Sequence, residues 1–262
     1  MEIMQEILNK SGFICDMDGV IYRGSKVLPG VPEFIRWMTD NNKKFMFLTN
    51  SPERTPQELS MKLKRMGLEV SSDHFYTSAM ATAEFIASQC PDCTAYVIGE
   101  PSLTKAMYDQ GIYMNDVNPE YVVLGETRTY CFEKVEKAIE LVNKGAKLIG
   151  CNPDTIGIME KGVIPATGSL IAPIEIATGK KAYFVGKPNP LIVRHALNRL
   201  GCHSSEIAFI GDRMDTDIIA GIESSLDTVL VLSGVTSRED VDNFPYRPKY
   251  VLSGICDLVT NL

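Results

Sequence analysis

The sequence has no excess of positive charge and no long apolar run, and each absence excludes a class of function. It has 26 Lys and Arg against 33 Asp and Glu, a net charge of −7, and no basic face of the kind that binds nucleic acid. No run approaches the ~18 apolar residues of a membrane span, and residues 1–10 lack the apolar core of a signal peptide. We therefore expect a cytoplasmic protein with neither a nucleic-acid polymer nor a membrane as partner.

Histidine and cysteine are too sparsely grouped to form a zinc site. There are three histidines, and the pair Cys90 and Cys93 has no second pair or His cluster beside it. Because Cys15, Cys151 and Cys256 lie in apolar runs and the total of seven is odd, we expect reduced thiols in a protein core. The C-x-x-C spacing is interpreted as incidental.

What the sequence does contain is a regular alternation of short apolar runs with amphipathic stretches. The runs expected to be strands buried on both faces are 45–48, 183–185, 208–210 and 229–232. Helices are expected near 31–41, 56–66, 189–200 and 213–222. This alternation predicts an α/β fold with a doubly wound parallel sheet.

The middle of the chain repeats the same alternation. Strands are expected at 95–98, 121–124 and 147–150, and helices near 101–110, 131–144 and 169–178. At 262 residues, the chain has room for one large domain or two smaller ones. The periodicity leaves open whether the middle segment extends the main sheet or forms a second domain.

The most informative feature is the pair Asp16 and Asp18, which follows the apolar run 13–15. In an extended segment, residues two apart point the same way, so both carboxylates project from one side. They repel each other unless a cation lies between them, or unless one acts as a nucleophile and the other as an acid or base. The alternative for an isolated D-x-D-G is an Asx-turn that closes a strand.

Three further polar clusters follow expected strands, at the edge where open parallel sheets bind ligands. They are Thr49-Asn50-Ser51, Gly186-Lys187-Pro188 and the segment 211–217. If the four strands are neighbours in one sheet, these clusters converge on one site. Their hydroxyl, amide and ammonium groups suit anionic oxygens, and Asp16 with Asp212 offers the oxygen ligands that Mg²⁺ prefers.

Each cluster also has a purely structural explanation when it is taken alone. Residues 49–51 can form an N-cap, and Lys187 can be any surface lysine. Asp212 can cap the helix that follows it, while Asp215 and Asp217 suit the dipole of its first turn. The order of the clusters along the chain makes coincidence the weaker explanation.

This order resembles the four-motif set of the haloacid dehalogenase (HAD) superfamily. The matching residues are Asp16-x-Asp18-Gly19-Val20, Leu48-Thr49-Asn50, Gly186-Lys187-Pro188 and Gly211-Asp212 with Asp217. Further segments are similar to the NagD-type phosphatases (class IIA, C2-type cap), and matches extend from about residue 12 to residue 248. These segments are Leu28-Pro29-Gly30, Tyr76–Ala83, Asn118-Pro119-Glu120, Gly125–Arg128, Asn152-Pro153-Asp154 and Leu232–Val235.

The resemblance implies roles for the clustered residues. Asp16 would be the nucleophile, and Asp18 would protonate the leaving alcohol and then activate water. Thr49 and Lys187 would hold the phosphoryl oxygens, with Lys187 also near Asp16. Asp16, the backbone carbonyl of Asp18 and Asp212 would bind Mg²⁺.

The resemblance also implies supporting roles near the phosphate. Asn50 would orient the phosphate or Asp16, with Ser51 beside it in substrate binding. Asp217 would lie in the outer shell of the metal or hold Lys187 in place. The sequence alone leaves Asp215 as an alternative to Asp217 in this role.

The resemblance further implies a division of the chain. Residues 1–82 and 183–262 would form a HAD-like Rossmannoid catalytic core, and residues 83–182 an inserted, smaller α/β cap of the C2 type. Asn152 and Asp154 would face the substrate, and the cap would select the leaving group. The alternative for these two residues is turn formation without a functional role.

The function implied is a Mg²⁺-dependent phosphatase that hydrolyses small phosphorylated metabolites through an aspartyl-phosphate. Nucleoside 5′-monophosphates such as UMP and GMP are the first candidates, and sugar-phosphate or phosphoglycolate phosphatase and phosphomutase are alternatives. Dehalogenation is disfavoured because it provides no leaving oxygen for Asp18 to protonate. A receiver-type binding module is about half this length and carries no inserted domain. Oligomeric state is left open.

Overall fold

The computed structural model describes residues 2–159 and 162–260, whose contacts divide the chain into two compact units. Unit 1 comprises Met1–Thr49, Leu59–Tyr76 and Lys187–Leu262, and unit 2 comprises Asn50–Glu58 and Thr77–Gly186. Each unit is built around its own parallel sheet. The assignment of residues 1–82 and 183–262 as catalytic core and of 83–182 as cap stays a prediction.

The sheet of unit 1 has six strands in the order β15-β14-β13-β1-β4-β5, and the pairings from β15 to β4 are all parallel. The strands are β1 (Gly12–Cys15), β4 (Lys44–Thr49), β5 (Phe75–Thr77), β13 (Ile207–Gly211), β14 (Asp227–Val231) and β15 (Tyr250–Leu252). The chain leaves β1 toward β4 in one direction and later returns to β13 on the other side. The predicted doubly wound parallel sheet is therefore confirmed.

The central strands of this sheet form because their residues are apolar without interruption. All four residues of β1 and all five of β13 are buried, as a strand covered on both faces requires. In the register, Phe13 lies opposite Ala208 and Phe45. Phe13, Ala208 and Phe45 belong to the hydrophobic core on one face of the sheet.

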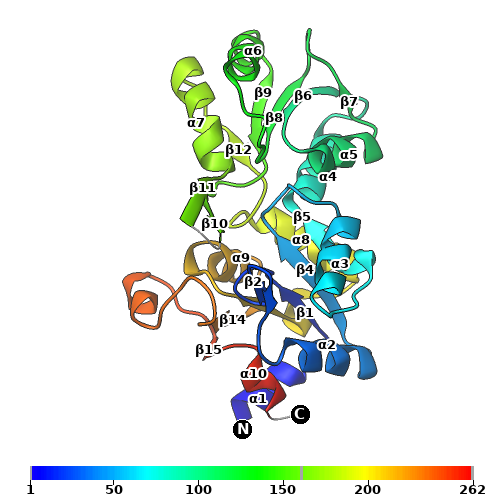
Figure 1. Cartoon of the computed structure of the whole chain (residues 1–262), viewed down its shortest axis with the longest axis vertical. Coiled ribbons are helices and arrows are strands. Elements are labelled where there is room, and N and C mark those ends of the chain that lie inside the picture. The colour runs from blue at the N-terminus through cyan, green and yellow to red at the C-terminus, as the bar shows by residue number, and fades with distance from the viewer. Residues whose placement is uncertain (1, 160–161, 261–262) are drawn as a thin grey trace. The chain divides into compact units, whose positions relative to one another are not determined.

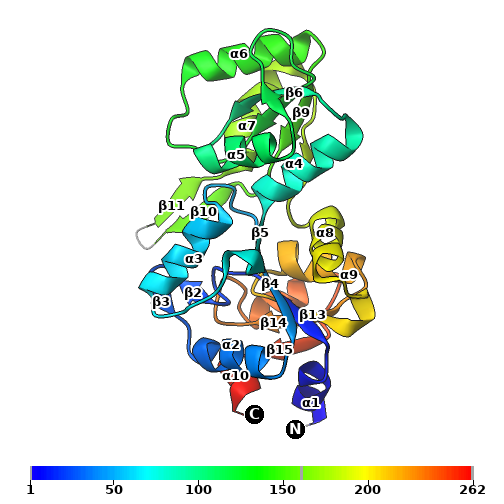
Figure 2. The same cartoon turned by 90° about the vertical axis from the view of Figure 1, so that its right-hand side faces the viewer.

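Helices cover both faces of this sheet (Figures 1 and 2). They are α1 (Glu2–Leu8), α2 (Val31–Asp40), α3 (Pro56–Arg65), α8 (Pro190–Leu200), α9 (Ile219–Glu223) and α10 (Cys256–Val259). Helix α2 buries Val31, Phe34, Ile35 and Met38, the spacing of one helical face, and packs with α3 and α10 on the core that contains Phe13. The expected helices at 31–41, 56–66 and 189–200 are confirmed to within a residue or two.

Unit 1 also contains a small hairpin and several short helical turns. The hairpin pairs β2 (Tyr22–Arg23) with β3 (Lys26–Val27) in antiparallel fashion. The 3₁₀ turns are Ser72–His74, Ser204–Glu206 and Glu239–Asn243. The helix expected at 213–222 is found in that place, but its first part, Met214–Ile218, is a π-helical turn, which α9 follows. A π turn is widened by one residue, which sequence periodicity does not reveal.

Unit 2 contains a five-stranded parallel sheet in the order β12-β9-β8-β6-β7. The strands are β6 (Thr94–Ile98), β7 (Tyr113–Met114), β8 (Tyr121–Leu124), β9 (Lys147–Gly150) and β12 (Tyr183–Phe184), and β10 (Ile156–Met159) pairs with β11 (Gly162–Pro165) in a separate hairpin. The helices are α4 (Ser78–Gln89), α5 (Pro101–Asp109), α6 (Phe132–Asn143) and α7 (Thr167–Thr178). Figure 1 shows α4 beside α5 and α6 beside α7. The elements expected in the middle of the chain are confirmed.

One expected strand lies in a different place from the prediction. The run 183–185 was expected to be a buried strand beside the three others, but β12 is an edge strand of the unit 2 sheet, and Tyr183 is 44% exposed. An aromatic, β-branched run favours a strand at an edge as much as at a centre, so its composition does not distinguish the two.

The structure also tests the expectations about membrane spans and cysteines. Among residues 2–159 and 162–260, no helix combines the length and the hydrophobicity that a membrane span requires. The seven cysteines are all free; Cys15 and Cys151 are buried, as expected, and Cys256 is partly buried.

Candidate active site

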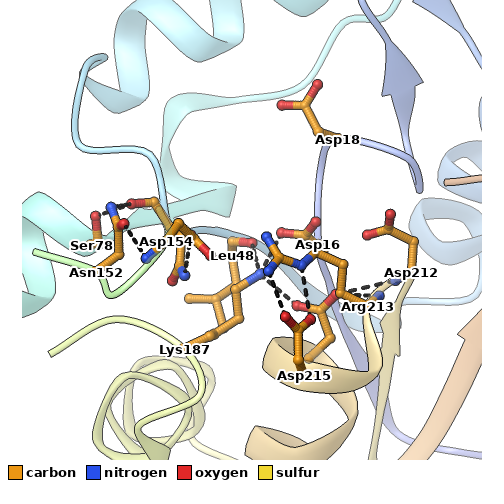
Figure 3. Close-up of polar contacts among 12 residues, drawn as sticks. Asp16, Asp18, Leu48, Ser78, Asn152, Asp154, Lys187, Asp212, Arg213 and Asp215 are labelled. Atoms are coloured by element: carbon orange, nitrogen blue, oxygen red, sulfur yellow. Dashed lines mark hydrogen bonds and ion pairs between the residues drawn. The ribbon is translucent and has the colours of Figure 1, made fainter. Parts of the chain in front are cut away.

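Three of the predicted polar clusters begin at the same edge of the unit 1 sheet. Asp16 directly follows β1, Thr49 is the last residue of β4, and Asp212 directly follows β13. Because β4 and β13 are the two neighbours of β1 and all three are parallel, their carboxyl ends lie side by side. Lys187, the first residue of the last segment of unit 1, joins them there (Figure 3).

The Lys187 ammonium group lies between two carboxylates. Its Nζ is 2.5 Å from Oδ1 of Asp16 and 2.7 Å from Oδ1 of Asp217, and it points toward the carbonyl of Leu48 at 3.5 Å. The residue is only 2% exposed. Burial alone would lower the pKa of Lys187, but Asp16 and Asp217 raise it above its usual range, so the lysine stays charged.

Asp217 is fixed by contacts on both of its carboxylate oxygens. While Oδ1 faces Lys187, Oδ2 accepts hydrogen bonds from the backbone N–H groups of Asp212 and Arg213, each at 3.1 Å. Asp215 instead points outward and pairs with the Arg213 guanidinium at 2.8 Å (Figure 3). Of the two aspartates that the sequence left open, Asp217 is thus the one that contacts Lys187.

Asp212 lies in a narrow space between two glycines. The Gly19 backbone has φ +81, and a Cβ there would come within 2.5 Å of Asp212 Oδ2; a Cβ on Gly234 would collide with the same carboxylate. Oδ2 accepts a hydrogen bond from the N–H of Val235 at 2.7 Å. The glycine that follows the D-x-D pair therefore makes room for the third aspartate.

The arrangement around Asp212 fits a divalent metal ion. Asp212 Oδ1 is buried and has no hydrogen-bond partner among the described residues. Carboxylate oxygens of Asp16, Asp212 and Asp217 all lie within 4.8 Å of one another. Burial and then the neighbouring Asp217 raise the pKa of Asp212 to about 7, and burial raises the pKa of Asp16 well above its usual range despite Lys187. A hard cation with oxygen ligands would relieve this crowding of charge.

Asp18 stands apart from this group. Its carboxylate is exposed and points away from Asp16 and Asp212 (Figure 3), and its Oδ2 accepts a hydrogen bond from the Tyr22 hydroxyl at 3.1 Å. Thr49, by contrast, is buried. The structure thus brings together Asp16, Lys187, Asp212 and Asp217, and it leaves the side chain of Asp18 outside that cluster.

The remaining predicted residues form a second polar network, within unit 2. The Asn50 side chain donates to Asp154 Oδ2 at 2.8 Å, and the Asn152 side chain donates to the Asn50 carbonyl, also at 2.8 Å. The Ser78 hydroxyl donates to the same carbonyl. Ser51 accepts a weak hydrogen bond from the N–H of Glu53 at 3.4 Å, which fits a turn. Asn50, Asn152 and Asp154 therefore hold one another in place.

Two members of these networks were not predicted as site residues. Glu126 is buried, and it accepts hydrogen bonds from the Asn152 side chain at 3.1 Å and from the N–H of Thr167 at 3.3 Å. Burial raises the pKa of this carboxyl group. Tyr22 was missed as well, because a tyrosine in an apolar segment gives no signal of a polar role. A signal for Glu126 did exist, since this acid comes two residues after the apolar strand β8, as the acids of the other polar clusters come shortly after their strands.

The chemistry of the unit 1 cluster suits the transfer of a phosphoryl group. A charged lysine beside the Asp16 carboxylate can attract phosphate oxygens toward it. The three aspartates and Lys187 together carry an excess of negative charge when ionised, which a divalent cation would offset. This is the combination that nucleophilic attack by a carboxylate on an anionic ester requires.

Comparison with known proteins gives concordant matches over most of the chain. The family model described as haloacid dehalogenase-like hydrolase matches residues 13–113, and one described as HAD-hydrolase-like matches residues 184–258. A dihydroxyacetone phosphatase from Corynebacterium glutamicum is 48% identical over 246 residues, which cover 94% of this chain and 90% of the relative. The ribonucleotide monophosphatase NagD from Escherichia coli is 42% identical over 245 residues, 94% and 96% of the two chains.

Solved structures agree with these matches. The structure of NagD from E. coli superposes with a TM-score of 0.90 at 41% identity, over 95% of this chain and 98% of that chain. A 4-nitrophenylphosphatase from Thermotoga maritima gives a TM-score of 0.92 at 34% identity, over 98% of both chains.

Proposed function

Because this chain belongs to the NagD-like (class IIA) family of haloacid dehalogenase-like hydrolases and is a phosphatase, we propose that it hydrolyses small phosphate monoesters through an aspartyl-phosphate on Asp16. The observation that carries this proposal is the buried Lys187, paired with both Asp16 and Asp217. Beside them lies an oxygen of Asp212 that has no hydrogen-bond partner among the residues that the structure describes. A buried lysine between two acids places positive charge where a transferring phosphoryl group needs it.

In the proposed first step, an oxygen of Asp16 attacks phosphorus as the bond from phosphorus to the leaving oxygen breaks. Asp18 supplies the proton that the leaving oxygen takes up. In the second step, Asp18 accepts a proton from water, whose oxygen attacks the phosphorus of the aspartyl-phosphate and frees Asp16. Lys187 and Thr49 bind the phosphoryl oxygens in both steps, and Asp217 keeps Lys187 oriented.

The donor set of the cluster supports a magnesium requirement. Asp16, Asp212 and the backbone carbonyl of Asp18 would hold Mg²⁺, with Asp217 supporting the site through Lys187. When bound, the ion supplies positive charge that offsets the negative charge of the phosphate and the carboxylates. The specific support for this assignment is Oδ1 of Asp212, which is buried and accepts no hydrogen bond within the described part of the chain.

For the substrate, we propose nucleoside 5′-monophosphates such as UMP and GMP first. The similarity to the NagD ribonucleotide monophosphatase supports this choice. Residues 83–182 are proposed as a cap that selects the leaving group, with Asn50, Ser51, Asn152 and Asp154 contacting the substrate. The mutual hydrogen bonds of Asn50, Asn152 and Asp154 would fix their donors and acceptors before the substrate arrives. A cytoplasmic location stays part of the proposal.

A second substrate class is favoured by a specific observation. The relative that is 48% identical over 94% of this chain is named a dihydroxyacetone phosphatase. Triose and sugar phosphates are therefore the second candidate, ahead of phosphoglycolate. Phosphomutase activity is distinguished by its product, since a mutase interconverts isomers and releases no inorganic phosphate.

A phosphate-release screen tests the proposal directly. The purified chain is assayed with Mg²⁺ against nucleoside monophosphates, dihydroxyacetone phosphate, sugar phosphates, phosphoglycolate and 4-nitrophenyl phosphate. We expect release from several of these esters, with kcat/KM highest for a nucleoside monophosphate. A higher value for dihydroxyacetone phosphate would select the second candidate, and no release from any ester above that of an Asp16→Asn control would refute the phosphatase proposal.

A further inference from the structure

Asp18 is hydrogen-bonded to a residue four positions along the chain, Tyr22. The Tyr22 hydroxyl donates to Oδ2 of Asp18 at 3.1 Å. The two residues differ sharply in their surroundings, because the Asp18 side chain is exposed whereas Tyr22 is only 3% exposed. An exposed carboxylate is thus hydrogen-bonded to a buried phenol.

The position of the Tyr22 hydroxyl is fixed by packing and by the backbone. Its ring belongs to the hydrophobic core of unit 1, and Tyr22 begins the β2–β3 hairpin opposite Val27. The turn between the two residues is closed by backbone hydrogen bonds, from Gly19 N–H to the Tyr22 carbonyl at 2.8 Å and from Tyr22 N–H to the Met17 carbonyl at 3.2 Å. The geometry of the Asp18–Tyr22 pair is therefore built into the fold.

A cation lies over the ring of the same tyrosine. The Nζ of Lys62, on helix α3, is 3.6 Å from the Tyr22 ring centroid. An ammonium group over the ring face is attracted by the ring electrons and draws electron density from the hydroxyl. Such a hydroxyl is a stronger hydrogen-bond donor, so Lys62 strengthens the bond to Asp18.

We propose that Tyr22 is a positioning residue for Asp18: its hydrogen bond orients the Asp18 carboxyl group for proton transfer to the leaving alcohol, and Lys62 supports it. This inference rests on the proposed function, in which Asp18 protonates the leaving oxygen. Because the Tyr22 hydrogen bond is made to Oδ2, it restricts the rotation of the Asp18 carboxyl group.

The hydrogen bond gains strength as the proton leaves. When phosphorus bonds to Asp16 and the ester P–O bond breaks, the proton of the Asp18 carboxyl group moves to the departing oxygen and Asp18 becomes a carboxylate. The Tyr22 hydroxyl then donates to a charged acceptor, which makes a stronger bond than the neutral acid does. Tyr22 therefore stabilises the transition state more than the ground state.

This role predicts a dependence on the leaving group. An alkyl alcohol is a poor leaving group and needs the proton, whereas 4-nitrophenolate departs without one. Tyr22→Phe should lower kcat/KM for the alkyl phosphate that the screen ranks first by about 10- to 100-fold, the range expected for a hydrogen bond to a charged group. For 4-nitrophenyl phosphate, kcat/KM should stay near the wild-type value, because kcat/KM reports only on steps through alcohol departure.

Two sets of variants complete the experiment. Asp18→Asn should show the same discrimination between the two esters, and more strongly. Tyr76→Phe is the matched control, because it removes a buried phenol hydroxyl that bonds to His195 and not to Asp18. Lys62→Met should lower kcat/KM for the alkyl phosphate in part, as Tyr22→Phe does. Lys62→Arg should restore the wild-type behaviour, because a guanidinium also binds a ring face. The Lys62 variants keep the test decisive if Tyr22→Phe folds poorly.

The outcomes separate the two levels of inference. If the wild type releases no phosphate from either ester, the proposed function fails. The positioning role is tested when the wild type is active and Asp18→Asn discriminates between the esters. It is then overturned if Tyr22→Phe and Lys62→Met lower kcat/KM equally for both esters, or if they behave like the control Tyr76→Phe.

Discussion

Replacing Lys187 with methionine should destabilise unit 1 strongly, because it removes a buried cation that contacts both Asp16 and Asp217. Methionine keeps most of the side-chain length, so the change is chiefly one of charge. Lys187 is 2% exposed, and the Asp217 side chain is 1% exposed. Breaking a buried ion pair by removing one partner typically costs about 3–5 kcal/mol, since the other charge is left buried and unpaired. We expect a loss of that size in the free energy of unfolding at pH 7.

The loss should depend on pH in a defined direction. With the lysine gone, Asp16 and Asp217 face each other without compensation, and burial together with Asp212 already raises the pKa of Asp16. A carboxyl group whose folded pKa is raised keeps a proton that the unfolded chain has released. Stability is therefore gained as the pH falls from 7 toward the unfolded value of about 4. The deficit of Lys187→Met should be greatest near pH 7 or above and should shrink near pH 5.

Urea unfolding measures this effect, with Trp37 fluorescence as the probe. Trp37 is the only tryptophan, and it packs on the core of unit 1. The measurement is made with a chelator present, because a bound cation would mask the missing charge. The matched control is Lys249→Met, which also removes a lysine shared by two acids, but at a site where the lysine is 42% exposed.

Two outcomes would refute this reasoning. One is a deficit for Lys187→Met that equals the small deficit expected for the exposed Lys249. The other is a deficit that does not change with pH. Adding Asp217→Asn to Lys187→Met should recover part of the lost stability, because it removes one of the two uncompensated charges.

Three further predictions concern the chemistry of the site. Asp16→Asn should abolish phosphate release while the urea midpoint stays at or above that of the wild type; substantial turnover would exclude Asp16 as the nucleophile. Removing divalent metal with a chelator should silence the enzyme, and Mg²⁺ should restore it, whereas full activity in the chelator would exclude the metal requirement. Asp217→Asn should lower kcat by about tenfold or more because Lys187 loses a charge-assisted bond, and Asp215→Asn should leave kcat nearly unchanged; equal effects would contradict the geometry.

The central strands could be predicted because a strand that is buried on both faces has an uninterrupted apolar sequence. Phe13 and its neighbours in β1 form an unbroken apolar run, and the strands on either side do the same. The place of Tyr183 could not be predicted, because strand propensity is local whereas sheet membership depends on distant partners. The π turn at 214–218 was missed for a similar reason, since its shape is fixed by the contacts of Asp217.

The site could be predicted as a set of residues but not as a geometry. Asp16 and Lys187 are 171 positions apart, so only the order of motifs connects them in the sequence. The choice between Asp215 and Asp217 depends on the direction of each side chain, because residues two apart in a helical turn point in different directions. The sequence does not identify Tyr22 as a partner of Asp18, because its ring is typical of a core residue and only its hydroxyl is polar.

The division of the chain into two units has a consequence for how new activities could arise. The residues proposed to break the ester bond, from Asp16 to Asp217, belong to unit 1, whereas Asn50, Ser51, Asn152 and Asp154 belong to unit 2. Each unit has its own sheet, so mutations in one core need not disturb the other. If residues of unit 2 select the leaving group as proposed, a mutational library confined to that unit would sample new leaving groups at constant chemistry. Natural drift in unit 2 could likewise diversify substrates among relatives while Lys187 and its two aspartates stay unchanged.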